Sequence, residues 1–182
     1  IGAKIDQRKL FDGVNDSVDI PLVSVTSMAA VLTRFSGVAG NDYVLSEGAS
    51  GSATGGYIRI DSSGNIFVLG AGETIKVDGA VTSVFPQDGL PHLLEVENID
   101  VTKNQFAAIG RFITTGYFEG SISDVILGTS RHYKLDELTG TVAVDSISGQ
   151  HGTYVNMTDP LPLLPSVLKG VVLGVDNSEI LG

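Results

Sequence analysis

Residues 10–21 read LFDGVNDSVDIP, and the second half of this stretch alternates polar and apolar side chains. Ser17, Val18, Asp19 and Ile20 therefore have the period of a β-strand with one face toward solvent. Pro21 lacks a backbone N–H, so we expect the strand to end there. A second stretch, FEGSISDVIL at residues 118–127, alternates in the same way. Both stretches predict strands.

The composition favours one all-β domain. A chain of 182 residues can bury a sizeable core but is short for two domains. Val, Ile, Thr, Ser and Gly are abundant, which suits short strands and tight turns. A net charge of −10 would repel a phosphate backbone, so we do not expect a nucleic-acid partner. No apolar run approaches the roughly 20 residues that span a bilayer, so no membrane insertion is expected.

The absence of cysteine excludes a disulfide framework but leaves the compartment open. The chain begins at Ile1, without an initiator Met or a signal-like pattern, and we expect it to be a fragment of a longer protein.

Further strands follow from local patterns along the chain. Residues 23–35, VSVTSMAAVLTRF, are apolar on both parities, as in a central strand; a short buried helix fits the same pattern, but Val, Thr and Ser favour a strand. Asp78-Gly79 is typical of a type I′ turn and predicts a hairpin over residues 75–81. The other predicted strands are residues 43–45, the hairpin of 57–61 with 66–69, and residues 92–97 and 105–113.

Three phrases in order resemble laminin-G-like domains of bacterial and phage proteins. FDGVNDSVDIP (11–21) is similar to their "FDGxxDYVxIP", with Ser17 where an aromatic residue is usual. IKVDG (75–79) resembles their "vyvDG", and FEGSISDVIL (118–127) resembles their closing "FxGxIDDVRIY". The resemblance implies an antiparallel jelly-roll β-sandwich of the concanavalin A-like type, which we place at residues 1–132.

The segment after residue 132 carries a fourth phrase. Residues 133–156, YKLDELTGTVAVDSISGQHGTYVN, resemble a phrase that precedes the "FDG" strand in most relatives but follows the closing strand here. Either a truncated second repeat begins at Tyr133, or residues 133–182 form a C-terminal extension that packs on the sandwich or on a neighbouring subunit. We favour the extension because the remaining tail, residues 160–182, is short, Pro-rich and apolar.

A metal site is one expectation of the resemblance. Asp124 shares strand parity with Ile122 and Ile126, which predicts a carboxylate on an apolar face, where it needs a partner. Related sandwiches hold a structural Ca²⁺ between the closing strand and oxygens near the first strand, and oxygen ligands suit this ion. The candidate ligands are Asp12, Asn15, Asp16 and Asp124. The alternative, weighed equally, is that these side chains bond neighbouring backbone groups.

The residues favour binding over catalysis. A glycosidase needs two carboxylates across a sugar, and the nearest pattern, Glu95 and Glu97, lacks the central Asp and terminal Glu of "Glu-x-Asp-x-x-Glu". His92, His132 and His151 have no zinc-site spacing. We therefore expect no enzymatic activity.

Sugar-binding sites pair an aromatic platform with planar polar side chains, because a pyranose has an apolar face and a rim of hydroxyls. The chain has no Trp, so Tyr must supply the platform. The candidates are Asn41, Asp42, Tyr43, Tyr57 and Arg59, each of which is equally explained as an ordinary surface residue.

The resemblance implies non-catalytic recognition of a cell-surface glycan by a module of a larger extracellular or virion protein, such as a phage tail receptor-binding protein or a bacterial adhesin. The alternative is a structural assembly or decoration module of a virion or adhesin, in which the sandwich binds no glycan and the apolar tail docks to a neighbour, either in a homo-oligomer or in a larger assembly.

Overall fold

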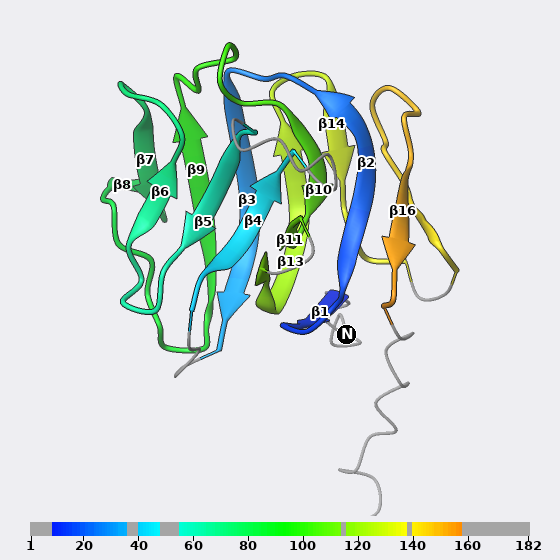
Figure 1. The fold of residues 1–182 in the computed structure, drawn as a ribbon, viewed down its shortest axis with the longest axis horizontal. Helices are drawn as coiled ribbons and strands as arrows, with labels where there is room; N and C mark the ends of the chain where they lie inside the picture. The colour runs from blue at the N-terminus through cyan, green and yellow to red at the C-terminus, as the bar shows by residue number, and fades with distance from the viewer. Residues whose placement is uncertain (1–8, 36–39, 48–54, 114–115, 138–139, 158–182) are drawn as a thin grey trace, which may run out of the picture.

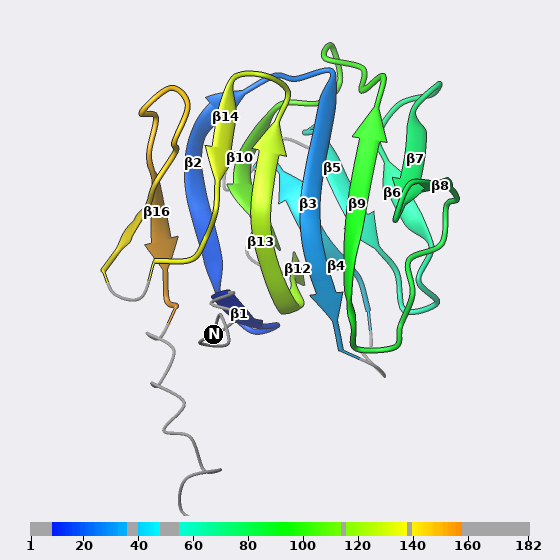
Figure 2. The same ribbon diagram turned by 180° about the vertical axis from the view of Figure 1, so that it is seen from behind.

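A computed structural model describes residues 9–35, 40–47, 55–113, 116–137 and 140–157. These residues form strands and turns, with no helix among them, and therefore none that is long and apolar enough to cross a membrane. Two antiparallel sheets lie face to face (Figures 1 and 2), which confirms the predicted all-β sandwich. The jelly-roll order of the strands stays a prediction.

The sheet that faces the viewer in Figure 2, sheet A, contains both the first and the closing strand. They lie side by side, with Phe11 opposite Gly120 and Asp12 opposite Glu119. Gly120 has φ +146°, and a Cβ there would overlap the carbonyl oxygen of Thr33. The strand order is β1 (Lys9–Asp12), β13 (Glu119–Leu127), β3 (Ser27–Arg34), β9 (Pro91–Glu97), β7 (Thr74–Val77), β8 (Ala80–Val81), with β14 (Arg131–Tyr133) also paired to β13.

The sheet that faces the viewer in Figure 1, sheet B, is built mainly from the middle of the chain. Its order is β15 (Val142–Ala143), β16 (Gly152–Val155), β2 (Ser17–Val23), β10 (Phe106–Ile109), β4 (Asp42–Ser46), β5 (Tyr57–Ile60), β6 (Ile66–Val68). A small ribbon of β11 (Arg111–Phe112) and β12 (Gly116–Tyr117) forms a third pair that contacts β4.

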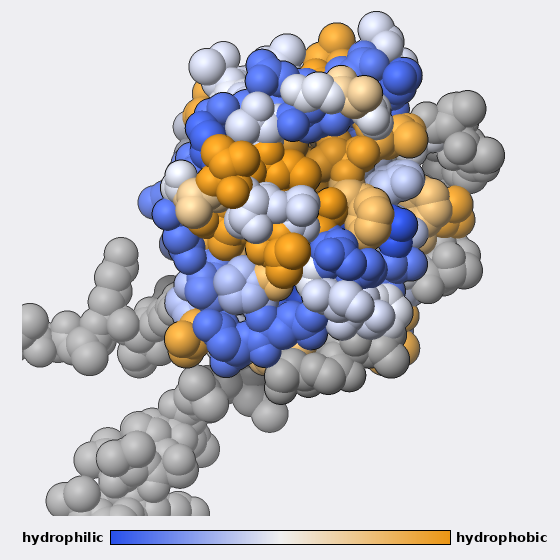
Figure 3. Space-filling model, turned by 90° about the vertical axis from the view of Figure 1, so that its left-hand side faces the viewer, coloured by the Kyte–Doolittle hydropathy of each residue, from blue (hydrophilic) through white to orange (hydrophobic). Residues whose placement is uncertain are grey.

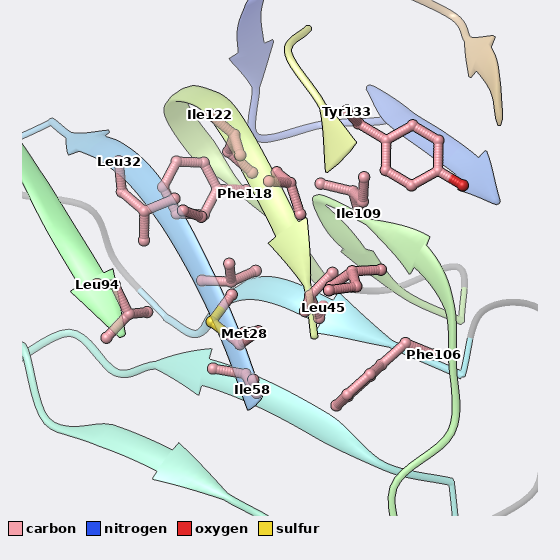
Figure 4. Close-up of a cluster of buried hydrophobic side chains, with 14 of the residues drawn as sticks. Met28, Leu32, Leu45, Ile58, Leu94, Phe106, Ile109, Phe118, Ile122 and Tyr133 are labelled. Carbon is pink, nitrogen blue, oxygen red and sulfur yellow. The ribbon is translucent and has the colours of Figure 1, made fainter. Parts of the chain in front are cut away.

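The core lies between the sheets (Figure 4). Leu32 and Leu94 of sheet A and Leu45, Ile58 and Ile109 of sheet B belong to one hydrophobic cluster, and all five are fully buried. Each such side chain contributes about 1.5–3 kcal/mol by leaving water. The alternation in the strands places these residues inward and their polar neighbours outward.

The predicted hairpins and central strand are confirmed. β5 pairs with β6, and β7 pairs with β8 through Asp78 (φ 51°) and Gly79 (φ 80°), the two left-handed residues of a type I′ turn. β3 lies between β13 and β9 and is a strand, not a buried helix.

Two strand boundaries differ from the sequence prediction. β2 continues through Pro21, because neither neighbouring strand needs a backbone N–H from this residue. β16 pairs with β2 only as far as Asp19, and the pairing of β2 with β10 shifts register between Phe106 and Ala108. Residues 105–113 are not one strand, because Gly110 (φ +81°) ends β10 and its lack of a side chain leaves room for the ring of Phe11.

The segment after residue 132 belongs to the sheets as far as the structure describes it. Tyr133 is fully buried, and β16 pairs with β2, with Tyr154 opposite Val18. The loop between them is fastened by Asp145, whose carboxylate accepts the N–H groups of His132 (2.9 Å) and Ile147 (3.0 Å). Residues 133–137 and 140–157 therefore pack on the sandwich and add strands to both sheets, and the tail at 160–182 lies outside the described residues.

Candidate functional site

Four of the five predicted sugar-binding residues lie together on the outer face of sheet B. Tyr43 on β4 is opposite Arg59 on β5, and Arg59 is opposite Phe67 on β6. Ile58 and Ile60, which flank Arg59, are fully buried, so Arg59 and Tyr57 point away from the core. Asn41 directly precedes β4 and joins the group through a hydrogen bond from Arg59.

Three aromatic rings from separate elements pack against one another on this face. The rings of Tyr43 and Phe112 stack, with centroids 4.7 Å apart and planes 13° apart. Tyr57 meets both rings edge to face, at 6.0 Å from Tyr43 and 5.9 Å from Phe112. Gly116 on β12 allows this packing, because a side chain there would overlap the ring of Tyr43. Such contacts fix the rings in one arrangement.

Polar groups border the rings. The guanidinium of Arg59 lies 4.3 Å from the ring centroid of Phe67 and 5.8 Å from that of Tyr57, and its Nη1 donates to Oδ1 of Asn41. The hydroxyls of Tyr43 and Tyr57 make no hydrogen bond to the described residues. Burial raises the pKa of Tyr43, so its hydroxyl remains a donor at neutral pH. We call Asn41, Tyr43, Tyr57, Arg59, Phe67 and Phe112 the aromatic face.

Phe67 and Phe112 were not among the predicted residues. Phe112 stands in a run of apolar residues that the sequence assigns to a buried strand, and only Gly110 marks the break that carries it outside. Phe67 could have been found from the hairpin register, since it lies directly opposite Arg59.

Asp42 is not a surface residue, and its prediction as a sugar ligand is wrong. Neighbouring residues on a strand point to opposite faces, so Asp42 points into the sandwich where Tyr43 points out. Its side chain is 1% exposed and pairs with Nε of Arg34, which is 0% exposed. Its Oδ1 also accepts the N–H of Glu119 at 3.1 Å. Burial raises the pKa of Asp42, and the Arg34 guanidinium opposes that rise.

The prediction that Asp124 is buried is also wrong. The pairing of β13 with β3 shifts register between Ser123 and Ile126, and Asp124 itself has φ 49°, so a β-bulge reverses the parity of the strand. Val125 is buried in its place, and the side chain of Asp124 is 54% exposed. Its Oδ1 lies 3.4 Å from Nε2 of His132.

Asp12, Asn15 and Asp16 form the turn between β1 and β2. Oδ1 of Asp12 accepts the N–H groups of Val14 (2.8 Å) and Asn15 (3.2 Å), and Oδ2 of Asp16 accepts the N–H of Asp12 (3.0 Å). Partial burial acts to raise the pKa of Asp12, but these N–H groups outweigh it and hold the pKa below its usual value. This is the backbone-bonding arrangement that was the alternative to a metal site.

The four candidate metal ligands do not converge. Asp12 is opposite Glu119, so Asp124 lies five positions further along β13, about 16 Å away at the rise of a strand. Calcium ligands must all lie within about 2.6 Å of the ion. Among the described residues, no three His, Asp or Glu side chains are placed to hold a metal. The Ca²⁺ ion stays a prediction from the resemblance, and Asp124 cannot share a site with Asp12.

Glu95 and Glu97 lie on the outer face of sheet A, on the opposite side of the sandwich from the aromatic face. With Ala29 and Ile126 they line a shallow hollow of about 150 Å³. Glu97 is held by Lys76, whose Nζ lies 2.8 Å from Oε1. These carboxylates and the aromatic face therefore do not form one site.

Comparison of the chain with protein-family models, curated proteins and solved structures finds no match.

Proposed function

We propose that the aromatic face binds a carbohydrate without changing it chemically, as a module of a larger extracellular or virion protein. One observation carries the proposal: rings from β4, β5 and β11 pack with an arginine and an asparagine on the outside of a sheet whose core is already complete. Phe67 is exposed and the other three rings are half-buried, and apolar clusters at a surface with convergent polar groups are typical of binding sites.

The chemistry of this face suits a pyranose. The ring surfaces of Tyr57, Phe67 and Phe112 match the C–H face of a sugar. The hydroxyls of Tyr43 and Tyr57 and the Arg59 guanidinium supply donors for sugar oxygens. Stacking between Tyr43 and Phe112 positions the rings in advance, which reduces the ordering cost of binding. None of the six residues carries a carboxylate, which favours binding over glycoside hydrolysis.

A glycan array tests the proposal. We expect the wild-type protein to bind at least one saccharide, and Phe112→Ala to weaken that binding about tenfold or more, because Phe112 supports the ring of Tyr43. Leu93→Ala is the matched control, since Leu93 is 37% exposed and belongs to β9 of sheet A. Absence of binding to every glycan, or equal loss in both variants, would contradict the proposal.

Assembly is the second candidate, and an apolar edge of the sandwich favours it. Figure 3 shows apolar side chains gathered on the side of the molecule where β6 and β8 lie. Val81 on β8 is 74% exposed, and Val84, which bridges to Asn65, is 47% exposed. A neighbouring copy of the chain would cover them. Light scattering of wild type and Val81→Lys tests this: assembly predicts an oligomer that the variant loses, and a monomeric wild type contradicts it.

A further inference from the structure

The described arginines differ in the groups that accept their hydrogen bonds. Arg34 and Arg111 each pair with a carboxylate, Asp42 and Asp19 respectively. Arg131, only 9% exposed, donates to the backbone carbonyl of Pro21 at 2.7 Å. Arg59 pairs with no carboxylate and no backbone carbonyl among the described residues, although the chain carries 21 acidic residues.

One neutral contact uses only part of the Arg59 guanidinium. Nη1 donates to the amide oxygen of Asn41, and the group carries further N–H donors in a rigid planar fork. The rings of Phe67 and Tyr57 hold the guanidinium over the sheet but accept none of these donors as hydrogen bonds. Within the described part of the chain, the guanidinium is therefore held in place with N–H donors unused, beside two tyrosine hydroxyls that also have no hydrogen-bond partner there.

We propose that the saccharide bound by the aromatic face carries a carboxylate, which the N–H donors of Arg59 bind. This inference rests on the proposed glycan-binding function and narrows its ligand to acidic sugars, of which uronic acids are the simplest. A planar guanidinium matches a carboxylate with two parallel hydrogen bonds, whereas a neutral hydroxyl uses only one.

The surroundings of Arg59 favour an external anion. Asp61, two residues along the chain, is occupied by the N–H groups of Ser63 (2.8 Å) and Asn65 (2.9 Å) in the β5–β6 turn. The hydrogen bond from the Asn65 side chain is the main cause that lowers the pKa of Asp61, and the charge of Arg59 lowers it further without an ion pair between the two. Asp61 is thus bound elsewhere, and the aromatic face contains no acidic residue that would compete with a ligand carboxylate.

The test compares acidic oligosaccharides with their neutral parents. Glucuronate, galacturonate and mannuronate oligomers are arrayed beside glucose, galactose and mannose oligomers of equal length and linkage. We expect the wild type to bind an acidic member about tenfold or more tightly than its neutral parent. Arg59→Gln should abolish this preference, and Arg59→Lys should retain part of it, because Lys keeps the charge without the fork.

Lys103→Gln is the control for net charge. It changes the charge of the chain by the same amount, at a side chain that is 54% exposed and lies 3.6 Å from Asp100. It should leave the preference unchanged, and melting curves of all variants check that they fold. Equal binding of acidic and neutral members by the wild type overturns this inference and leaves the proposed function standing. Binding of neither class also overturns this inference, and it overturns the proposed function as well when the wild type binds no saccharide of the full glycan array. An unchanged preference in both Arg59 variants overturns the role of Arg59.

Discussion

Arg34 of sheet A and Asp42 of sheet B form an ion pair that is enclosed between the two sheets. Their side chains are 0% and 1% exposed, and the two terminal nitrogens of Arg34 have no hydrogen-bond partner among the described residues. Removing two charges from water is costly, and their mutual attraction offsets this only when the geometry is good. The pair also places β4, and with it Tyr43, relative to β3.

Breaking this pair should destabilise the fold strongly. Asp42→Ala leaves a buried guanidinium without a counter-charge, and we expect the free energy of unfolding to fall by about 3–5 kcal/mol. The double variant Arg34→Met with Asp42→Leu should lose much less. Urea unfolding followed by circular dichroism measures both, and a single variant as stable as the wild type would contradict the enclosed pair.

Replacing Gly120 by alanine should destabilise the fold much more than replacing Gly72. Both have positive φ, +146° and +101°, but a Cβ on Gly120 would overlap the carbonyl oxygen of Thr33, whereas Gly72 faces open space. We expect Gly120→Ala to be less stable than Gly72→Ala by about 2 kcal/mol or more, because only the first must also move the backbone of β3. Equal unfolding free energies of the two variants would contradict the close approach of β13 to β3 at Gly120.

A chain that ends at His132 should not fold, whereas one that ends at Met157 should. The shorter chain loses Tyr133 and Leu135, both fully buried, and β16, which covers the edge of β2. Each buried side chain of this size is worth about 1.5–3 kcal/mol, against a typical total stability of about 5–15 kcal/mol. Calorimetry gives the answer, and a cooperative transition at the same temperature in both chains would place residues 133–157 outside the sandwich.

His92 should make stability depend on pH. Its ring lies 2.6 Å from Asp78 and 3.0 Å from Asp88, and mainly the hydrogen bond with Asp78 raises the pKa of His92 above 6.5. The charged ring is thus favoured by folding, so its stabilisation is complete below about pH 6.5 and is lost as pH rises through the folded pKa. The effect is modest because both carboxylates are about half exposed.

The measurement is the melting temperature between about pH 6 and about pH 9, where protonation of His92 changes. We expect a decline in the wild type that is smaller in His92→Gln. His151→Gln controls for the loss of a histidine whose ring nitrogen instead accepts the N–H of Asp145. Identical pH profiles for wild type and His92→Gln would contradict the role of the Asp78–His92–Asp88 contact.

The alternation of polar and apolar residues predicts which side chains share a face of a regular strand. Tyr57 and Arg59 are two residues apart on one predicted strand, so alternation places them on the same face, and the structure agrees. Strict parity would also have excluded Asp42, the direct neighbour of Tyr43. Asp124 could not be predicted, because a bulge reverses parity without a clear signal in the sequence.

Local sequence patterns do not predict contacts between residues that are far apart in the chain. Phe112 reaches Tyr43 only because Gly110 turns the chain across sheet B, and nothing in an apolar run shows which side it will cover. The pairing of β16 with β2 joins residues more than a hundred positions apart, so the sequence placed an extension against the sandwich but could not show which strand it would pair with.

The central claim, that the aromatic face binds a glycan, is tested most directly by NMR titration of the wild-type protein with the oligosaccharide that the array ranks highest. The account predicts backbone amide shifts confined to Tyr43, Tyr57, Arg59, Phe67, Phe112 and their strand neighbours. Shifts centred instead on the hollow at Ala29 and Glu95, or on the edge at Val81, would contradict it.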